Sequence, residues 1–144
     1  MKEGNLERFI DAQQRDYPIA LKEIKAGRKQ GHWMWYIFPQ LQGLGNTETS
    51  KFYALADLNE ADTYLSHPLL GSRLVEICNE LLKLNKNDPN TIFGHPDDLK
   101  LKSSMTLFAE IPLTNPVFIQ VLNKFYDGSK DDKTLNLLKN RQNI

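Results

Sequence analysis

The side chains with the most distinctive chemistry lie in one segment, residues 31–40. His32 is followed closely by Trp33, Trp35 and Tyr36, so both tryptophans of the chain stand beside a histidine. Aromatic rings stack on planar ligands, and an imidazole titrates near neutral pH. We therefore expect these residues to line a pocket for a planar small molecule, such as a base or a nicotinamide. The polar residues expected at its rim are Gln40, Ser50, Tyr53 and Arg73.

The same segment has a second interpretation that needs no ligand. Its periodicity is neither helical nor strictly alternating, and aromatic side chains bury large areas in protein cores. Residues 31–40 would then form the hydrophobic centre of the domain, as a buried turn or a short helix. Both interpretations hold if alternate residues face opposite ways.

Three classes of function remain open. The first is a binding module for a nucleotide-like small molecule, because the aromatic segment lies in a chain without a recognisable catalytic set. The second is a small hydrolase or transferase acting on a nucleotide or an ADP-ribose-like substrate, with His32 as the acid–base group. The third is a protein-interaction module without catalysis, which would expose an apolar patch. A basic cluster that could hold phosphate, or simply be a solvated helix face, comprises Lys22, Lys25, Arg28 and Lys29.

Other combinations of reactive side chains have simpler explanations. Lys100 has the helical spacing to reach Ser103 or Ser104, as in a Ser–Lys dyad, but small residues there also permit close helix packing. Arg73 has acidic neighbours at helical spacing, and we expect it to pair with Glu76 or Glu80. The helix dipole stabilises negative charge at a helix start, so the paired acids at two expected helix starts need no catalytic role. These pairs are Asp97-Asp98 and Asp131-Asp132.

Neither a metal nor a cofactor is predicted. His32, His67 and His95 share no short ligand spacing, and His67 and His95 precede prolines where an imidazole can cap a backbone group. The glycines at 43 and 45 match neither the P-loop nor the dinucleotide-binding fingerprint. The single cysteine, Cys78, falls in an apolar stretch and is expected to be a buried, inert thiol.

The elements that position these residues are expected to be helices. Leucine occurs 21 times and valine only three times, and leucine loses little rotamer freedom in a helix. Capping signals and helical spacing predict an all-α, single domain over residues 1–144, with about six to seven helices and an irregular aromatic-rich segment. Its tail, residues 139–144, should fray. The predicted helices lie at about 6–13 after Asn5 as N-cap, from 18 to a stop at Gly27 or Gly31 after Asp16 or Tyr17, 58–65 after Asp57, 70–84, 97–111, 116–127 and 131–138, with a loop at 85–90.

The apolar faces of these helices predict the core. The clearest stripe, with i, i+4, i+7, i+11, i+14 spacing, runs from Leu70 to Leu84. The expected core residues are Phe9, Ile10, Ile24, Leu70, Leu74, Ile77, Leu81, Met105, Phe108, Val121, Leu122 and Phe125.

Charge and cysteine content bound the partners and the compartment. The formal net charge is +0, which supplies no global attraction for nucleic acid or an anionic membrane, so neither is expected as a partner. The N-terminus carries no apolar signal region, no apolar run approaches a membrane span, and one cysteine permits no internal disulfide. These features favour a cytoplasmic protein whose expected partner is a small molecule.

Several strings in the chain resemble a bacterial family of unknown function, domain of unknown function 1810, whose members are sometimes labelled calpastatin. The most specific is His-Trp-Met-Trp-Tyr-Ile-Phe-Pro-Gln-Leu at residues 32–41. The resemblance covers about Leu6 to Leu138. It implies a compact, mostly helical fold, and it brings no established activity and no catalytic residues. The further matching stretches are 12–13, 20–24, 27–29, 60–61, 64–71 and 99–108.

Overall fold

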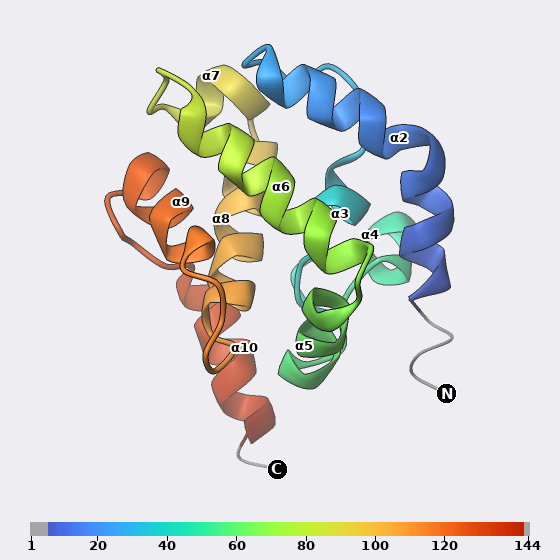
Figure 1. Cartoon of the computed structure of the whole chain (residues 1–144). Coiled ribbons are helices and arrows are strands. Elements are labelled where there is room, and N and C mark those ends of the chain that lie inside the picture. Colours follow the sequence, from blue (N-terminus) through green and yellow to red (C-terminus); the bar gives the residue numbers. More distant parts are fainter. Residues whose placement is uncertain (1–5, 143–144) are drawn as a thin grey trace.

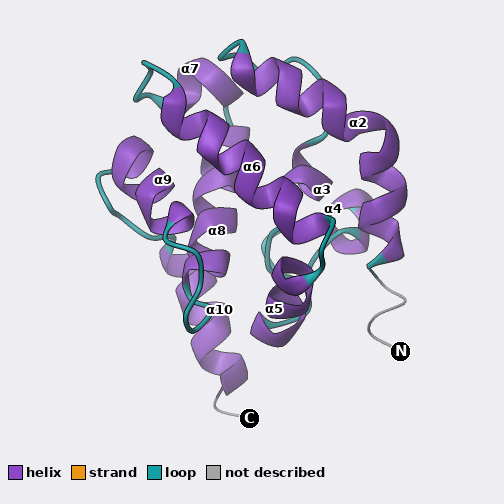
Figure 2. Cartoon of the chain, in the orientation of Figure 1, coloured by secondary structure: helices purple, strands orange, loops and turns teal. Residues whose placement is uncertain are grey.

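The computed structural model describes residues 6–142, and within them the chain is built from helices and loops without a strand (Figure 2). Six helices are longer than two turns: α2 (Glu7–Lys25), α5 (Leu58–Ser66), α6 (Leu70–Lys83), α8 (Asp97–Ala109), α9 (Val117–Tyr126) and α10 (Asp132–Gln142). Three short helices lie between them: α3 (Met34–Ile37), α4 (Glu48–Phe52) and α7 (Pro89–Phe93). The all-α prediction is confirmed, whereas the predicted number of helices is too low for the described residues.

The prediction that Pro18 separates two helices is wrong. Residues 7–25 form one helix with Pro18 inside it, so neither Asp16 nor Tyr17 is a cap. Pro18 is exposed, and the buried stripe of the helix, which runs from Phe9 to Ile24, continues past it on the other side. Packing of that stripe outweighs the lost backbone hydrogen bond, and α2 changes direction along its length, as proline requires (Figure 1). The predicted cap Asn5 lies outside the described residues, and Leu6 is the N-cap.

The short helix α3 agrees with the buried turn or short helix that the second interpretation allowed for residues 31–40. Helices α4 and α7 were not among the predicted helices, because one or two turns are too short to show a period. The predicted loop at 85–90 in fact contains the start of α7, where Asp88 accepts a hydrogen bond from the backbone N–H of Asn90 (2.9 Å). The same Asp-Pro pair signals both a turn and a helix start.

Two helices, α6 and α8, organise the packing. Helices α5 and α9 each pack against both of them, α2 crosses α6, and α7 and α10 pack on α8 (Figure 1). A chain of aromatic contacts joins four elements, from Phe9 through Tyr64 and Phe108 to Phe118, with centroid separations of 5.1, 5.7 and 5.4 Å. The predicted core residues are all buried except Ile10, which is partly buried against the core. The expected buried thiol is confirmed: Cys78 is fully buried, and burial raises its pKa.

Helix ends follow the predicted capping chemistry in most places. Asp57 accepts from the N–H of Glu60 (2.8 Å) at the start of α5. His67 Nδ1 accepts from two backbone N–H groups at the start of α6, those of Leu69 (3.1 Å) and Leu70 (3.2 Å). His95 instead contacts the Asp98 carboxylate. No helix of the described residues has the length and apolarity that a bilayer crossing requires.

Candidate functional site

The aromatic segment presents two faces. Trp33, Met34, Ile37 and Phe38 are buried, whereas Trp35 and Tyr36 are only half-buried. One turn of helix, α3, produces this division, because it turns alternate parts of the segment toward the core and toward solvent. The segment therefore supplies both a piece of the core and a piece of the surface.

Trp33 belongs to the core. Its ring is 2% exposed and lies near the rings of Phe38 and Phe93. Its indole N–H donates to Glu23 Oε1 (2.9 Å), which also accepts from the N–H of Gly31 (2.9 Å). This carboxylate on α2 anchors the loop that leads into α3, and it leaves Trp33 with no face for a ligand.

Tyr36 and Tyr53 lie together on the side of α2. Their ring centroids are 5.0 Å apart, and the Tyr36 hydroxyl donates to the Asp16 carboxylate. Burial and this carboxylate raise the pKa of Tyr36, so its hydroxyl stays protonated as a donor. The two rings line an open hollow of about 300 Å³ with Asp11, Arg15 and Asp16.

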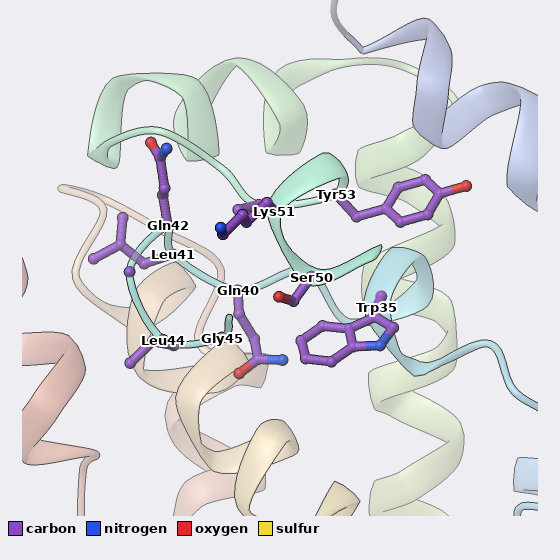
Figure 3. A pocket seen from close by; sticks show the side chains of 11 residues that line it. Trp35, Gln40, Leu41, Gln42, Leu44, Gly45, Ser50, Lys51 and Tyr53 are labelled. Atoms are coloured by element: carbon purple, nitrogen blue, oxygen red, sulfur yellow. The ribbon is translucent and has the colours of Figure 1, made fainter. Parts of the chain in front are cut away.

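Trp35, Gln40, Ser50 and Tyr53 meet around a small cavity between α3, α4 and the loop 40–45 (Figure 3). The loop passes so close to α4 that a Cβ at Gly45 would lie 2.6 Å from Ser50 Oγ. The cavity volume is about 10 Å³, which is far below the size of a small-molecule site. A ligand therefore cannot occupy this cavity, but the residues around it also reach the surface.

Gln40 is the most unusual residue of the group. Two backbone hydrogen bonds to Leu55 hold this part of the loop in place. The N–H of Leu55 donates to the Gln40 carbonyl (2.9 Å), and the Leu55 carbonyl accepts from the N–H of Gln42 (2.8 Å). The side chain is 6% exposed, and its Nε2 is buried without a hydrogen-bond partner among the described residues. This nitrogen points toward the indole of Trp35 (Figure 3), and an aromatic face is only a weak acceptor.

Gln40 also lines a second, open hollow of about 240 Å³. We call it the Gln40 hollow; its lining residues are Gln40, Leu44, Pro96, Leu99, Lys100, Ser103, Asp131 and Lys133. Lys100 Nζ lies 4.1 Å from the centroid of the Trp35 ring and 3.0 Å from Asp97 Oδ1. Lys100 therefore connects the lining of the hollow to the half-buried ring of Trp35.

The lysines and acids around the hollow are not equivalent. Asp97 pairs with both Lys29 (2.8 Å) and Lys100 (3.0 Å). Burial raises the pKa of Asp97, but the hydrogen bonds from these two lysines outweigh it and hold that pKa below its usual range. Lys133 is exposed and has no ion-pair partner within residues 6–142. It is the cation of the hollow that remains available to a ligand.

Two predicted site residues lie elsewhere. Arg73 donates to Gln13 Oε1 (3.3 Å) and lies over the ring of Tyr17. The predicted pairing with Glu76 or Glu80 is wrong, because Glu76 accepts from the Tyr17 hydroxyl (2.5 Å) and Glu80 pairs with Lys83. His32 is exposed, and its imidazole has no hydrogen-bond partner in the described part of the chain.

The remaining candidate clusters are also separated by the fold. Ser103 Oγ donates to the Leu99 carbonyl (3.2 Å) while Lys100 is held by Asp97, so no Ser–Lys dyad forms. In the predicted basic cluster, Lys29 forms an ion pair with Asp97. In the predicted acidic pair, Asp131 caps α10 by accepting from the N–H of Thr134 (2.9 Å). Between residues 6 and 142, no three acidic, histidine or cysteine side chains gather where they could hold a metal ion.

Sequence reasoning did not connect Lys100 and Lys133 to the aromatic segment. Lys100 was considered only with its helical neighbours, and Lys133 lies in a different helix, α10. Spacing along one helix predicts only contacts within that helix. The packing of α10 on α8 brings the two lysines to one hollow.

Comparison with known proteins agrees with this fold. A solved structure of a conserved hypothetical protein from Mycobacterium tuberculosis superposes with a TM-score of 0.92 at 46% identity, covering 94% of this chain and 96% of that one. No curated protein matches the chain. The model of a family described as proteins of unknown function, DUF1810, matches residues 3–138, and the chain belongs to this family.

Proposed function

We propose that the protein is a small-molecule binding module, and that the Gln40 hollow takes a nucleotide-like ligand with a planar ring and an anionic group. The observation that carries the proposal is the amide nitrogen of Gln40, which is buried and has no hydrogen-bond partner within residues 6–142. A buried donor without an acceptor lowers the stability of a fold by about 1–3 kcal/mol. Such groups are therefore rare in folded proteins, and each one needs a structural or functional explanation. A ligand acceptor atom would offset that cost.

Gln40 is placed to meet a ligand from the hollow. It lines both the closed cavity and the open hollow, and the terminal torsion of a glutamine is broad and roughly two-fold. Rotation of the amide can therefore turn Nε2 from Trp35 toward the hollow, while the clamped backbone stays still. A fixed backbone with a rotating amide suits recognition of a ring carbonyl or ring nitrogen.

The charges of the hollow favour an anionic group on the ligand. Lys100 and Lys133 both line it. Asp131 also lines it and keeps its negative charge while it accepts from the N–H and hydroxyl of Thr134 (2.9 and 2.6 Å), but the two lysines outnumber this carboxylate. A phosphate at this wall would meet the unpaired ammonium of Lys133 directly.

The remaining wall is apolar and suits a planar ring. Leu44, Pro96 and Leu99 contribute it, and Leu99 is 52% exposed although it is a large apolar residue. Covering such a side chain with a ring removes apolar surface from water, which is favourable. The half-buried indole of Trp35, next to Lys100, lies close enough to report on occupancy.

A thermal-shift screen with mononucleotides, ADP-ribose and nicotinamide nucleotides tests the proposal. A ligand present at about 100 times its dissociation constant adds roughly 2.7 kcal/mol of stability, or roughly 8 °C for a chain of this size. We expect a hit to change tryptophan emission, and to be weakened at least tenfold by Lys133→Gln and by Gln40→Met.

Lys22→Gln is the matched control, because Lys22 is an exposed lysine on α2 that does not line the hollow. If Lys22→Gln abolished binding and Lys133→Gln did not, the ligand would lie on the basic cluster and the proposal would be refuted. The absence of any stabilising compound in the panel would also count against a nucleotide-like ligand.

A further inference from the structure

A separate groove lies between α5, the first half of α6 and the α8–α9 connection, which is the orange loop in front of α10 in Figure 1. We call it the Leu113 groove. Its volume is about 650 Å³, larger than that of the Gln40 hollow, and the two share no lining residue. The groove residues used below are Asp62, Leu65, Gly71, Val75, Glu76, Ile111, Leu113 and Thr114.

Leu113 is the unusual feature of this groove. Its φ is 60°, in the left-handed region, and its side chain is 105% exposed. Left-handed backbone costs a residue with a Cβ roughly 1–2 kcal/mol, and leucine gains no local hydrogen bond there in return. The fold therefore exposes a large apolar side chain to water at the rim of a groove. It also holds this leucine in a backbone conformation that is unfavourable for a residue with a Cβ.

The walls and floor of the groove are apolar and fixed. Leu65 and Val75 are partly buried against the core, and Ile111 is buried. A Cβ at Gly71 would lie 1.9 Å from the Leu65 carbonyl oxygen, so α5 and α6 are in backbone contact beneath the groove. In the wall next to Leu113, Thr114 Oγ1 is buried without a hydrogen-bond partner among the described residues.

The charged residues that line the groove are Asp62 and Glu76, and both are acidic. Among residues 6–142, neither a lysine nor an arginine lines it. Glu76 accepts from the Tyr17 hydroxyl, which leaves the carboxylate charge in place. The groove is therefore complementary to a partner that combines an apolar side chain with a positive charge.

We propose that the Leu113 groove docks a short peptide segment of another protein, in which an apolar side chain lies beside a lysine or arginine. The apolar side chain packs between Leu113 and Val75, and the basic one faces Asp62 and Glu76. A fully exposed leucine that becomes covered by a partner has the apolar area of an interface hot spot.

Selection of a random peptide display library on the purified protein tests this. We expect enriched sequences that pair apolar with basic residues, and binding that weakens with added salt. Leu113→Asn should weaken the selected peptides roughly tenfold to a hundredfold, the factor that corresponds to burying one leucine side chain. Asp62→Lys should weaken them through charge reversal.

Two choices of variant separate a loss of binding from a loss of structure. Asparagine accepts the left-handed conformation, so Leu113→Asn should fold at least as well as the parent protein, and a loss of binding is not a loss of structure. Ile119→Asn is the matched control, because Ile119 is an exposed apolar residue of α9 that does not line the groove. Enrichment of acidic peptides, or of peptides that bind the Leu113→Asn and Ile119→Asn variants equally well, would overturn the proposal.

Discussion

Two buried glutamines with opposite hydrogen-bonding states permit a direct test of the reasoning about the site. Gln13 is 1% exposed, and its Nε2 donates to the Tyr36 carbonyl (2.8 Å) and the Tyr64 hydroxyl (2.9 Å). Gln40 is 6% exposed, and its Nε2 has no partner among the described residues. Methionine has a similar volume and flexibility without hydrogen-bonding cost, so the same substitution can be made at both positions.

The two substitutions should have opposite effects on stability. Gln13→Met removes the amide that donates to the Tyr36 carbonyl and the Tyr64 hydroxyl. We expect a loss of about 2–4 kcal/mol in the free energy of unfolding. Gln40→Met removes an unsatisfied donor, and we expect no loss or a gain of about 1 kcal/mol. For a chain of this length, 1 kcal/mol corresponds to roughly 3 °C in melting temperature.

Thermal and urea unfolding followed by far-ultraviolet circular dichroism measure both effects without relying on the tryptophans. Gln120→Met, at an exposed position of α9, is the control and should stay within about 0.5 kcal/mol of the parent protein. If Gln40→Met lowered the melting temperature as much as Gln13→Met, the Gln40 amide would have a structural partner in solution. The argument for a ligand at Gln40 would then fail.

Three further predictions concern the framework of the two sites. Burial raises the pKa of Glu23, but hydrogen bonds from Gly31, Gln30 and Trp33 together with the nearby charge of Lys29 outweigh it and hold the pKa below its usual 4.5. A depressed pKa in the folded state adds stability above the unfolded pKa that is lost as the pH falls, so the stability difference between the parent protein and Glu23→Gln should shrink during acid titration below about pH 4.5. Gly71→Ala should destabilise the protein by roughly 2–4 kcal/mol in urea unfolding, because its Cβ would meet the Leu65 carbonyl at 1.9 Å and backbone must move; an unchanged unfolding midpoint would contradict the close approach of α5 and α6. Leu113→Asn should raise the free energy of unfolding by up to about 1 kcal/mol through relief of the left-handed leucine; calorimetry that shows destabilisation would mean that Leu113 packs against the fold in solution.

The sequence predicted the longer helices because their signals are local. Each signal depends on residues within one or two turns of one another. Examples are the apolar face of α6, the Asp57 N-cap of α5 and the end of α9 just before Gly128. Pro18 was misread for the same reason: locally it disfavours a helix, and the packing of α2 against α6 overrides that preference.

Of the predicted site residues, the fold joins Trp35, Gln40, Ser50 and Tyr53, with Tyr36 beside Tyr53. It assigns Trp33 to the core and places Arg73 against α2. Composition singles out the aromatic segment, but it cannot say which ring faces the core. That choice depends on where the loop after α2 is anchored, and the anchor is the contact between Glu23 and Trp33.

The sequence alone determined that the chain is helical, where most of its helices run, part of the side chains that form its core, and to which family it belongs. These properties follow from periodicity, capping and matching strings, all of which are read along the chain. Only the tertiary structure showed the unpartnered Gln40 amide beside Lys100 and Lys133, and the exposed Leu113 over an acidic groove. Both features join residues from different helices, and their properties are set by burial and by missing partners, which exist only once the helices have packed.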